Sequence, residues 1–351
     1  MRSGVSVGTS ATEWVASLSP WPEEFGLDRM RELLARLGDP QTRYPAIHVV
    51  GTNGKSTATR TIAALLRAEG LRVGAYTSPH VSGWHERLDC DPATFERAVA
   101  RVRGSAEPLG ATQFEVLTAA ALAEFAEAGV DVAVVEAGLG GRLDATNVVD
   151  AEVVLLTNIA LEHTEVLGDT IEEIAKEKLA VAHAARVVVI SDNTLRSLVP
   201  STTRIVPGGA REAAEAFLGS PIETEVDEVT LPGRLEHRDG ELWDGAHTPE
   251  AVDWLLERLP ERERVLCVSI LADKRVDELL ERLAHAGRTL VATQSSNPRA
   301  LPADELAARA ERYFDHVDAI ADPKEALARA RALGGPVLVT GSLYLLADLH
   351  S

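Results

Sequence analysis

The fold of this chain is decided by the stretch His48-Val49-Val50-Gly51-Thr52-Asn53-Gly54-Lys55-Ser56-Thr57. It ends an apolar run over residues 46–50, which predicts a buried strand, and it opens a helical pattern over 56–69. The two glycines let backbone N–H groups turn toward a phosphate, the helix N-terminus adds positive potential, and the lysine neutralises charge. The stretch predicts a nucleotide phosphate loop in a compact form, because Val49 stands where the full pattern has a glycine. The alternative is a plain strand-to-helix turn with incidental glycines.

Strands and helices alternate outward from this loop. Apolar runs predict further strands over 72–76, 130–135, 152–157, 264–270, 289–293 and 336–340. Helical spacing predicts helices over 22–38, 93–103, 114–128, 170–183, 276–286 and 302–312. The pattern blurs over 200–232, where Pro-Gly pairs interrupt it. We therefore expect an α/β protein with a mainly parallel sheet in residues 1–231 and a smaller α/β domain in residues 232–351.

Composition excludes several classes of partner. The chain has 351 residues, with 35 Lys and Arg against 54 Asp and Glu, a net charge of -19. This acidity argues against nucleic acid and anionic membranes as partners. Cys90 and Cys267 lie far apart in sequence without a metal-type cluster, as expected for buried thiols in a reducing compartment. Residues 1–20 contain no uninterrupted apolar segment, and no run of about 18 apolar residues occurs, so we expect a cytoplasmic protein.

Polar side chains follow three of the predicted strands. Ser78 follows the strand at 72–76, Glu136 follows the strand at 130–135, and His163 follows the strand at 152–157. The carboxyl ends of parallel strands meet at one edge of a sheet, where open α/β sheets bind ligands. A carboxylate there can hold Mg²⁺, which takes oxygen ligands and bridges to ATP phosphates. The alternatives are a satisfied strand-end carboxylate, a turn-forming serine and a core histidine.

The Gly51–Lys55 loop resembles that of the Mur ligase superfamily, and its neighbours resemble the folylpolyglutamate synthase/dihydrofolate synthase branch. The matching segments are 76–80 with 86–87, 114–118, 136–147 (EAGLGGRLDATN), 157–170 with Glu177-Lys178, 231–236 (LPGRLE) and 243–249 (WDGAHTP). The resemblance implies a Mur-ligase-like P-loop parallel-sheet ATPase domain and a Rossmann-like C-terminal glutamate-ligase domain.

The resemblance also implies roles for particular residues. Those for ATP binding are Gly51, Thr52, Asn53, Gly54, Lys55, Ser56, Thr57, Arg234, Asp244 and His247. Those for one or two Mg²⁺ ions are Ser78, Glu136, His163 and, when it is carbamylated, Lys178. Those for catalysis are Lys55, Lys178 and His163. Taken alone, Lys178 reads as a solvated helix charge and Arg234 as an ordinary surface arginine. The glycine-rich loop at 138–141 borders the substrate cleft in the family.

The sequence departs from the family pattern at several places. Ser56 replaces a third glycine of the phosphate loop, and Thr248 replaces an asparagine in the second domain. The segments after Arg87 and between 185 and 230 are shorter than usual, and the second lacks the family's Gln…Asn segment. These segments help to shape the pterin side of the cleft, so the chemistry transfers to this chain better than the identity of the acid.

The expected reaction is an ATP-dependent ligation in the synthesis of folates for one-carbon metabolism. The carboxylate of dihydropteroate or a reduced folate would form an acyl phosphate, and the amine of L-glutamate would displace phosphate, with closure of the second domain excluding water. The alternatives are a Mur-type ligase for a different carboxylic acid and a non-catalytic nucleotide-binding protein. The resemblance implies a monomer.

Overall fold

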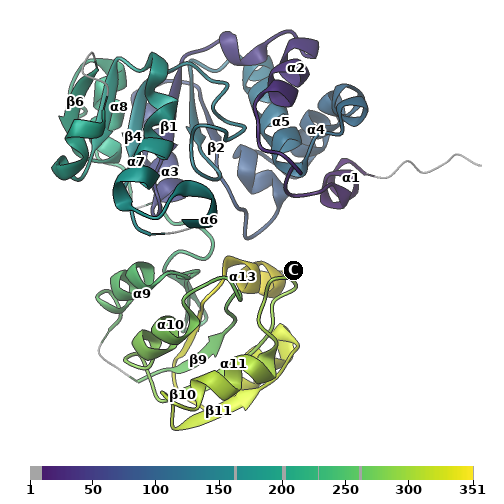
Figure 1. Ribbon diagram of the computed structural model, residues 1–351, viewed down its shortest axis with the longest axis vertical. Coiled ribbons are helices and arrows are strands. Elements are labelled where there is room, and N and C mark those ends of the chain that lie inside the picture. The colour runs from purple at the N-terminus through teal and green to yellow at the C-terminus, as the bar shows by residue number, and fades with distance from the viewer. Residues whose placement is uncertain (1–9, 162–163, 200–202, 228, 261–262, 351) are drawn as a thin grey trace, which may run out of the picture. The chain divides into compact units, whose positions relative to one another are not determined.

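The computed structural model describes residues 10–161, 164–199, 203–227, 229–260 and 263–350. The chain divides into two compact units (Figure 1). The first comprises residues 1–79 and 84–229, and the second comprises residues 80–83 and 230–351. The chain thus leaves the first unit briefly after Pro79, and Val81 lies in the apolar core of the second unit.

A six-stranded parallel sheet forms the centre of the first unit, in the order β2-β3-β1-β4-β5-β6. Its strands are β1 (Ala46–Val50), β2 (Val73–Tyr76), β3 (Val132–Glu136), β4 (Ala151–Leu156), β5 (Val187–Ile190) and β6 (Arg204–Pro207). The first strand in the sequence, β1, lies between β3 and β4, so later strands are added on both sides of it. The edge beyond its carboxyl end is therefore a switch point, where sheets of this kind bind ligands.

Helices cover both faces of this sheet. They are α1 (Ala11–Ser17), α2 (Asp28–Arg36), α3 (Lys55–Ala68), α4 (Pro92–Ala106), α5 (Gln113–Ala128), α6 (Thr164–Leu167), α7 (Ile171–Leu179) and α8 (Ala210–Leu218), with 3-10 turns η1 (Pro40–Thr42), η2 (Trp84–Leu88), η3 (Glu107–Leu109), η4 (Ala180–Ala184) and η5 (Asn193–Leu198). Ile47 and Val49 of β1 pack against α3 and α8, whereas Ala46 joins the cluster of α1, α2, α4 and α5 (Figure 1). Burial on both faces explains why the strands read as continuous apolar runs.

The second unit contains another six-stranded sheet, in the order β11-β10-β9-β12-β8-β7, parallel except for the β7–β8 pair. Its strands are β7 (Glu236–Arg238), β8 (Glu241–Trp243), β9 (Val265–Val268), β10 (Thr289–Ala292), β11 (His316–Ala319) and β12 (Val337–Thr340). Its helices are α9 (Pro249–Leu256), α10 (Val276–Leu283), α11 (Ala303–Ala310), α12 (Pro323–Ala332) and α13 (Leu343–His350). The predicted α/β class with a parallel sheet and a second α/β sheet is confirmed.

One local prediction was wrong in its bounds, and two strands of the first sheet were not predicted. The helix predicted over 22–38 begins only at Asp28, because Pro22 and Gly26 disfavour helix in the preceding turn, which leaves Phe25 exposed. The blurred region holds β6 and α8. The strand β6 was not predicted, because it is an edge strand whose side chains are only partly buried and which lacks a long apolar run. The strand β5 was also not predicted, although Val187–Ile190 is a fully buried apolar run.

Candidate active site

The phosphate loop, residues 51–54, turns directly from β1 into α3. Gly51 has a φ of +144°, and a Cβ there would overlap Thr157 Oγ1. Gly54 has a φ of +78° and is the N-cap of α3. Both glycines are thus required by backbone conformation, and Gly51 also by the close approach of the next segment. Thr52, Asn53 and the first turn of α3, with Ser56 and Thr57, complete the predicted ATP-binding segment.

The segment after β4 supports this loop through hydrogen bonds. The Thr52 amide donates to Asn158 O at 2.9 Å, and the Asn53 amide donates to Asn158 Oδ1 at 2.8 Å. Thr157 Oγ1 donates to Asn53 O at 2.8 Å. The Thr157-Asn158 pair lies in a segment that matches the family, but the motif alone gives it no role. Its signal was the position of two polar residues directly after an apolar strand.

Two lysine ammonium groups meet at the carbonyl of Gly51. Lys55 Nζ donates to Gly51 O at 3.0 Å and to Thr52 O at 2.9 Å. Lys178 Nζ donates to Gly51 O at 2.8 Å, and only 2% of the Lys178 residue surface is exposed. The reading of Lys178 as a solvated helix charge is therefore wrong, because this lysine lies on the buried face of α7 with Ile174, Ala175 and Leu179.

Glu136, the last residue of β3, is buried beside the loop with 1% of its surface exposed. Its Oε1 accepts a hydrogen bond from Ser56 Oγ at 3.0 Å, and its Oε2 accepts one from the Ser78 amide at 3.0 Å. The structure thus brings together the phosphate helix, the end of β3 and the segment after β2. His163, predicted as a metal ligand and catalytic group, lies outside the described residues.

The donors around Glu136 suit a magnesium ion. Mg²⁺ is commonly held by one or two carboxylates together with substrate phosphates, rather than by a complete cage of protein ligands. Glu136 supplies a carboxylate, and Ser56 and Ser78 bring hydroxyl groups to the same edge of the sheet. Among the described residues, no group of three or more His, Cys, Asp or Glu side chains is placed to hold a metal. The fit therefore rests on one carboxylate with neutral oxygens.

The glycine-rich loop after Glu136 packs tightly on its surroundings. A Cβ at Gly138 would lie 2.5 Å from the Phe114 ring, and one at Gly141 would lie 2.5 Å from the carbonyl oxygen of Lys178. At both positions the backbone lies too close to its neighbour for a side chain to fit. The second contact presses the loop against the end of α7, the helix that carries Lys178.

Three predicted residues gather in one corner of the second unit. Asp244 is buried, and its carboxylate accepts from the Leu235 amide at 2.9 Å and from the Ala246 amide at 2.8 Å. This joins the turn that carries Arg234 to the turn that carries His247, whose Nδ1 lies 2.8 Å from Gly245 O. Burial raises the pKa of Asp244. Asp244 therefore organises both turns.

Comparison with known proteins identifies the family. The Mur ligase middle domain matches residues 49–231, and the Mur ligase glutamate ligase domain matches residues 233–343. The chain belongs to the Mur ligase family. A curated dihydrofolate synthase/folylpolyglutamate synthase of Mycobacterium tuberculosis is 32% identical over 389 residues, covering 84% of this chain and 80% of that protein. This similarity places the chain in the branch that the phosphate loop and its neighbours predicted.

Solved structures agree with this placement. The folylpolyglutamate synthase of Mycobacterium tuberculosis complexed with ADP has a TM-score of 0.85 and 29% identity, covering 94% of this chain and 95% of that one. Escherichia coli FolC in complex with DHPP and ADP has a TM-score of 0.84 and 28% identity, covering 97% of each chain. The Yersinia pestis bifunctional synthase with Mn, AMPPNP and L-glutamate bound has a TM-score of 0.82 and 27% identity, covering 97% of each chain. The predicted fold and the predicted class of enzyme, an ATP-dependent acid–amino-acid ligase, are confirmed.

This Mur ligase departs from its relatives in two respects that the structure clarifies. Its alignment with the Mycobacterium tuberculosis protein spans 389 residues but uses only 84% of a 351-residue chain, so that relative has segments with no counterpart here. Thr248, which the resemblance sets where the family pattern has asparagine, is the N-cap of α9, and its Oγ1 accepts from the Ala251 amide at 3.3 Å. A cap of this kind is a role that asparagine and threonine share.

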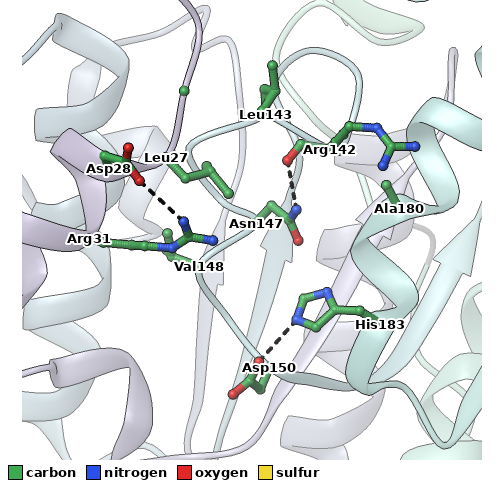
Figure 2. A pocket seen from close by; sticks show the side chains of 11 residues that line it. Leu27, Asp28, Arg31, Arg142, Leu143, Asn147, Val148, Asp150, Ala180 and His183 are labelled. Atoms are coloured by element: carbon green, nitrogen blue, oxygen red, sulfur yellow. Dashed lines mark hydrogen bonds and ion pairs between the residues drawn. The ribbon is translucent and has the colours of Figure 1, made fainter.

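A pocket of about 560 Å³ lies in the first unit between the start of α2, residues 142–150 and η4 (Figure 2). Its apolar wall includes Leu27, Leu143 and Val148. Its polar rim is internally paired: Arg31 Nη1 lies 3.5 Å from Asp28 Oδ1, and His183 Nε2 lies 3.2 Å from Asp150 Oδ1 (Figure 2). The glycine-rich loop, continued to Asn147, thus forms one wall of the pocket.

Proposed function

We propose that this ligase joins the amine of L-glutamate to the carboxylate of dihydropteroate or a reduced folate, cleaving ATP to ADP and phosphate. The proposal is carried by Glu136, a buried carboxylate tied to Ser56 of the phosphate helix and to the Ser78 amide. This carboxylate suits the Mg²⁺ that accompanies ATP turnover, and it lies at the same sheet edge as the phosphate loop, where Lys55 and Lys178 both donate to Gly51 O. The names and bound molecules of the related synthases support glutamate and a pterin acid as the substrates.

The reaction proceeds in two displacements. A carboxylate oxygen of the acid bonds to the γ-phosphorus of ATP, and the bond from that phosphorus to ADP breaks. The nitrogen of glutamate then bonds to the acyl carbon, phosphate leaves with the C–O electron pair, and the nitrogen releases its proton. Each step moves negative charge onto phosphoryl oxygens, so fixed cations lower both barriers.

The residues of this chain supply that positive charge and the orientation. The phosphate loop, residues 51–57, cradles the phosphates, with Lys55 as a point charge and Arg234 able to bridge two oxygens. Asp244 and His247 approach the nucleotide and the incoming amino acid. One or two Mg²⁺ ions would be held by Ser78, Glu136, His163 and Lys178 if carbamylated, and would neutralise phosphate charge. In this assignment residues 1–231 bind ATP and the acid, and residues 232–351 form the glutamate-ligase domain.

Glutamate-dependent ADP release tests the function directly. The protein is incubated with ATP, Mg²⁺ and L-glutamate, with dihydropteroate and tetrahydrofolate as separate acceptors. We expect release with at least one acceptor and none when glutamate is omitted. ATP binding without release for either acceptor would contradict the proposal. Because the relatives have segments with no counterpart here, a Mur-type ligase for another carboxylic acid is the second candidate, and release with such an acid alone would establish it.

Lys178 gives a sharper test, because the same helix offers a matched control. Replacing Lys178 by methionine keeps the length of the side chain and removes the charge beside Gly51 O, along with any carbamate. We expect ADP release to fall about 10²-fold, the lower end of losses for one preorganised electrostatic group. Lys176→Met, in the exposed pair with Glu172 at 2.7 Å, should leave the rate unchanged. Equal rates of ADP release in the two variants would show that Lys178 has no role in catalysis.

We also propose that the protein is cytoplasmic and that it is a monomer, the second being what the resemblance implies. In the described part of the chain, no helix has the length and apolarity needed to cross a bilayer. Light scattering of the purified protein measures the oligomeric state, and a mass of twice 37.6 kDa would contradict the monomer.

A further inference from the structure

His48 is the one polar residue of β1, and it lies in the centre of the first sheet. It is fully buried, and it pairs in register with Val135 of β3 and Val154 of β4. An imidazole at such a place is costly unless it makes a hydrogen bond. Burial lowers the pKa of His48 to about 3, so the ring is neutral at physiological pH.

A chain of hydrogen bonds leads from this ring into the glycine-rich loop. His48 Nε2 lies 2.9 Å from Thr146 Oγ1, and Thr146 Oγ1 bonds to Asp144 Oδ1. Oδ1 also accepts from the Thr146 amide at 3.0 Å, and Oδ2 accepts from the Leu139 amide at 2.7 Å. Burial raises the pKa of the Asp144 carboxyl, and the hydrogen bonds from Thr146 and from the Leu139 amide oppose that shift. An ionised carboxylate only accepts, so the Thr146 hydroxyl donates to Asp144. Its lone pair then accepts from His48, which places the imidazole proton on Nε2.

The ring acts through this nitrogen alone. Among the described residues His48 Nδ1 has no hydrogen-bond partner, although the atom is buried. A side chain that keeps a donor at the position of Nε2 should therefore replace the histidine, and one of similar size without a donor should not. This asymmetry makes the role of His48 testable.

The glycine-rich loop held by these hydrogen bonds connects Glu136 to the segment that supports the phosphate loop. It starts two residues after Glu136, which accepts from Ser56 and Ser78, and it leads into β4 and then to Asn158 beneath the phosphate loop. Leu143 and Asn147 of the loop line the 560 Å³ pocket (Figure 2). Asp144 accepts hydrogen bonds from the amides of Leu139 and Thr146 and so holds these two residues together. His48 connects Thr146 to β1, the strand that leads into the phosphate loop.

We infer that His48 is a positioning residue that sets the glycine-rich loop, through Thr146 and Asp144, in the place where it meets the acid substrate. This inference rests on the proposed function, in which the loop borders the acid. His48 touches neither substrate nor nucleotide. It acts on the affinity for the acid more than on the affinity for ATP, because the loop, and not the backbone of residues 51–54, is what it holds.

Kinetics of four single variants test this role. His48→Leu and Thr146→Val, which each remove one member of the chain, should raise KM for the acid about tenfold, the order of effect of one buried hydrogen bond, with KM for ATP changed by less than about twofold. His48→Gln, whose amide N–H reaches the position of Nε2, should restore a KM near that of the unmodified protein. Tyr44→Phe is the matched control, since it removes a buried hydrogen bond to Leu122 O of 2.7 Å elsewhere in the same unit.

Two comparisons would overturn the inference. One is an unchanged KM for the acid in His48→Leu, and the other is an equal rise in Tyr44→Phe or in His48→Gln. The double variant His48→Leu/Thr146→Val should be no worse than the worse single variant, because both break the same chain. Additive effects would show that His48 acts by another route.

Amide hydrogen exchange separates this inference from the proposed function, because it requires no substrate. The amides of Leu139 and Thr146 should exchange at least about tenfold faster in His48→Leu and Thr146→Val, and at the rate of the unmodified protein in Tyr44→Phe. Unchanged exchange in His48→Leu overturns the inference even if the enzyme ligates folates. Conversely, failure of the unmodified protein to release ADP refutes the proposed substrate, while faster exchange still shows that His48 positions the loop.

Discussion

Replacing Lys55 by alanine is expected to lower ADP formation about 10³-fold while the protein stays folded. The ammonium group lies at the mouth of the phosphate loop, 3.0 Å from Gly51 O and 2.9 Å from Thr52 O. In the reaction it would turn to the γ-phosphate, where charge accumulates. Loss of one preorganised electrostatic group of this kind costs about 10²- to 10³-fold in rate, and the phosphate lysine is expected at the upper end.

The matched control for Lys55 is Arg72→Ala. Arg72 is an exposed cation just before β2, at the opposite edge of the same sheet, where it pairs with Asp131 at 2.9 Å. It should retain full activity, because exposed pairs of this kind contribute little. Thermal unfolding checks that both variants are folded. If the folded Lys55→Ala variant forms ADP at the normal rate, Lys55 has no part in the mechanism and the ligase assignment is weakened.

Replacing Glu136 by glutamine is expected to lower ADP formation about 10²- to 10³-fold, with little loss of stability. The amide oxygen of glutamine can accept from the Ser78 amide, and its NH₂ group can donate to Ser56 Oγ, whose hydroxyl then turns to accept. Both contacts of 3.0 Å therefore survive, and only the negative charge is lost. The experiment thus separates the charge of this carboxylate from its structural role.

The control for Glu136 is Glu152→Gln on β4 of the same sheet, where the carboxylate is half exposed and pairs with Arg186 at 3.0 Å. It should retain the rate and the Mg²⁺ dependence of the unmodified protein. Glu136→Gln should in addition need more Mg²⁺ for half-maximal rate, because a neutral amide is a weaker ligand than a carboxylate. An unchanged Mg²⁺ requirement would show that Glu136 does not hold the metal, even if the rate falls.

Features encoded within a few residues were predictable from the sequence. The apolar run before Gly51 and the helical pattern after Lys55 specify β1, the loop and α3 locally, and the strand was predicted with the bounds that the structure shows, Ala46–Val50. The end of β3 at Glu136 follows equally from its own run of apolar residues. The resemblance extended these local readings to a family, and the comparisons confirmed it.

The burial of Lys178 is encoded in the spacing of α7. Ile174 lies four residues before Lys178, and Leu179 follows it, so helical spacing places Lys178 on the apolar face of α7 and Lys176 on the opposite face. The number of charged residues in this helix, taken without their spacing, suggests that Lys178 is exposed to solvent. The spacing alone still does not say that the buried ammonium group meets the carbonyl of Gly51, which lies 127 positions away in sequence.

The sequence by itself therefore determined the phosphate loop and the strand-end carboxylate, because each depends on neighbouring residues whose backbone conformations are coupled, and it indicated the family through several short motifs. Only the tertiary structure decided that Asn158 supports the loop, that Lys178 donates to Gly51, and that His48 reaches Thr146 across 98 positions of sequence. These contacts depend on which strands become neighbours in the sheet. That order is a property of the whole sheet, set by the crossovers that carry the chain between its parallel strands, and no local pattern of residues encodes it.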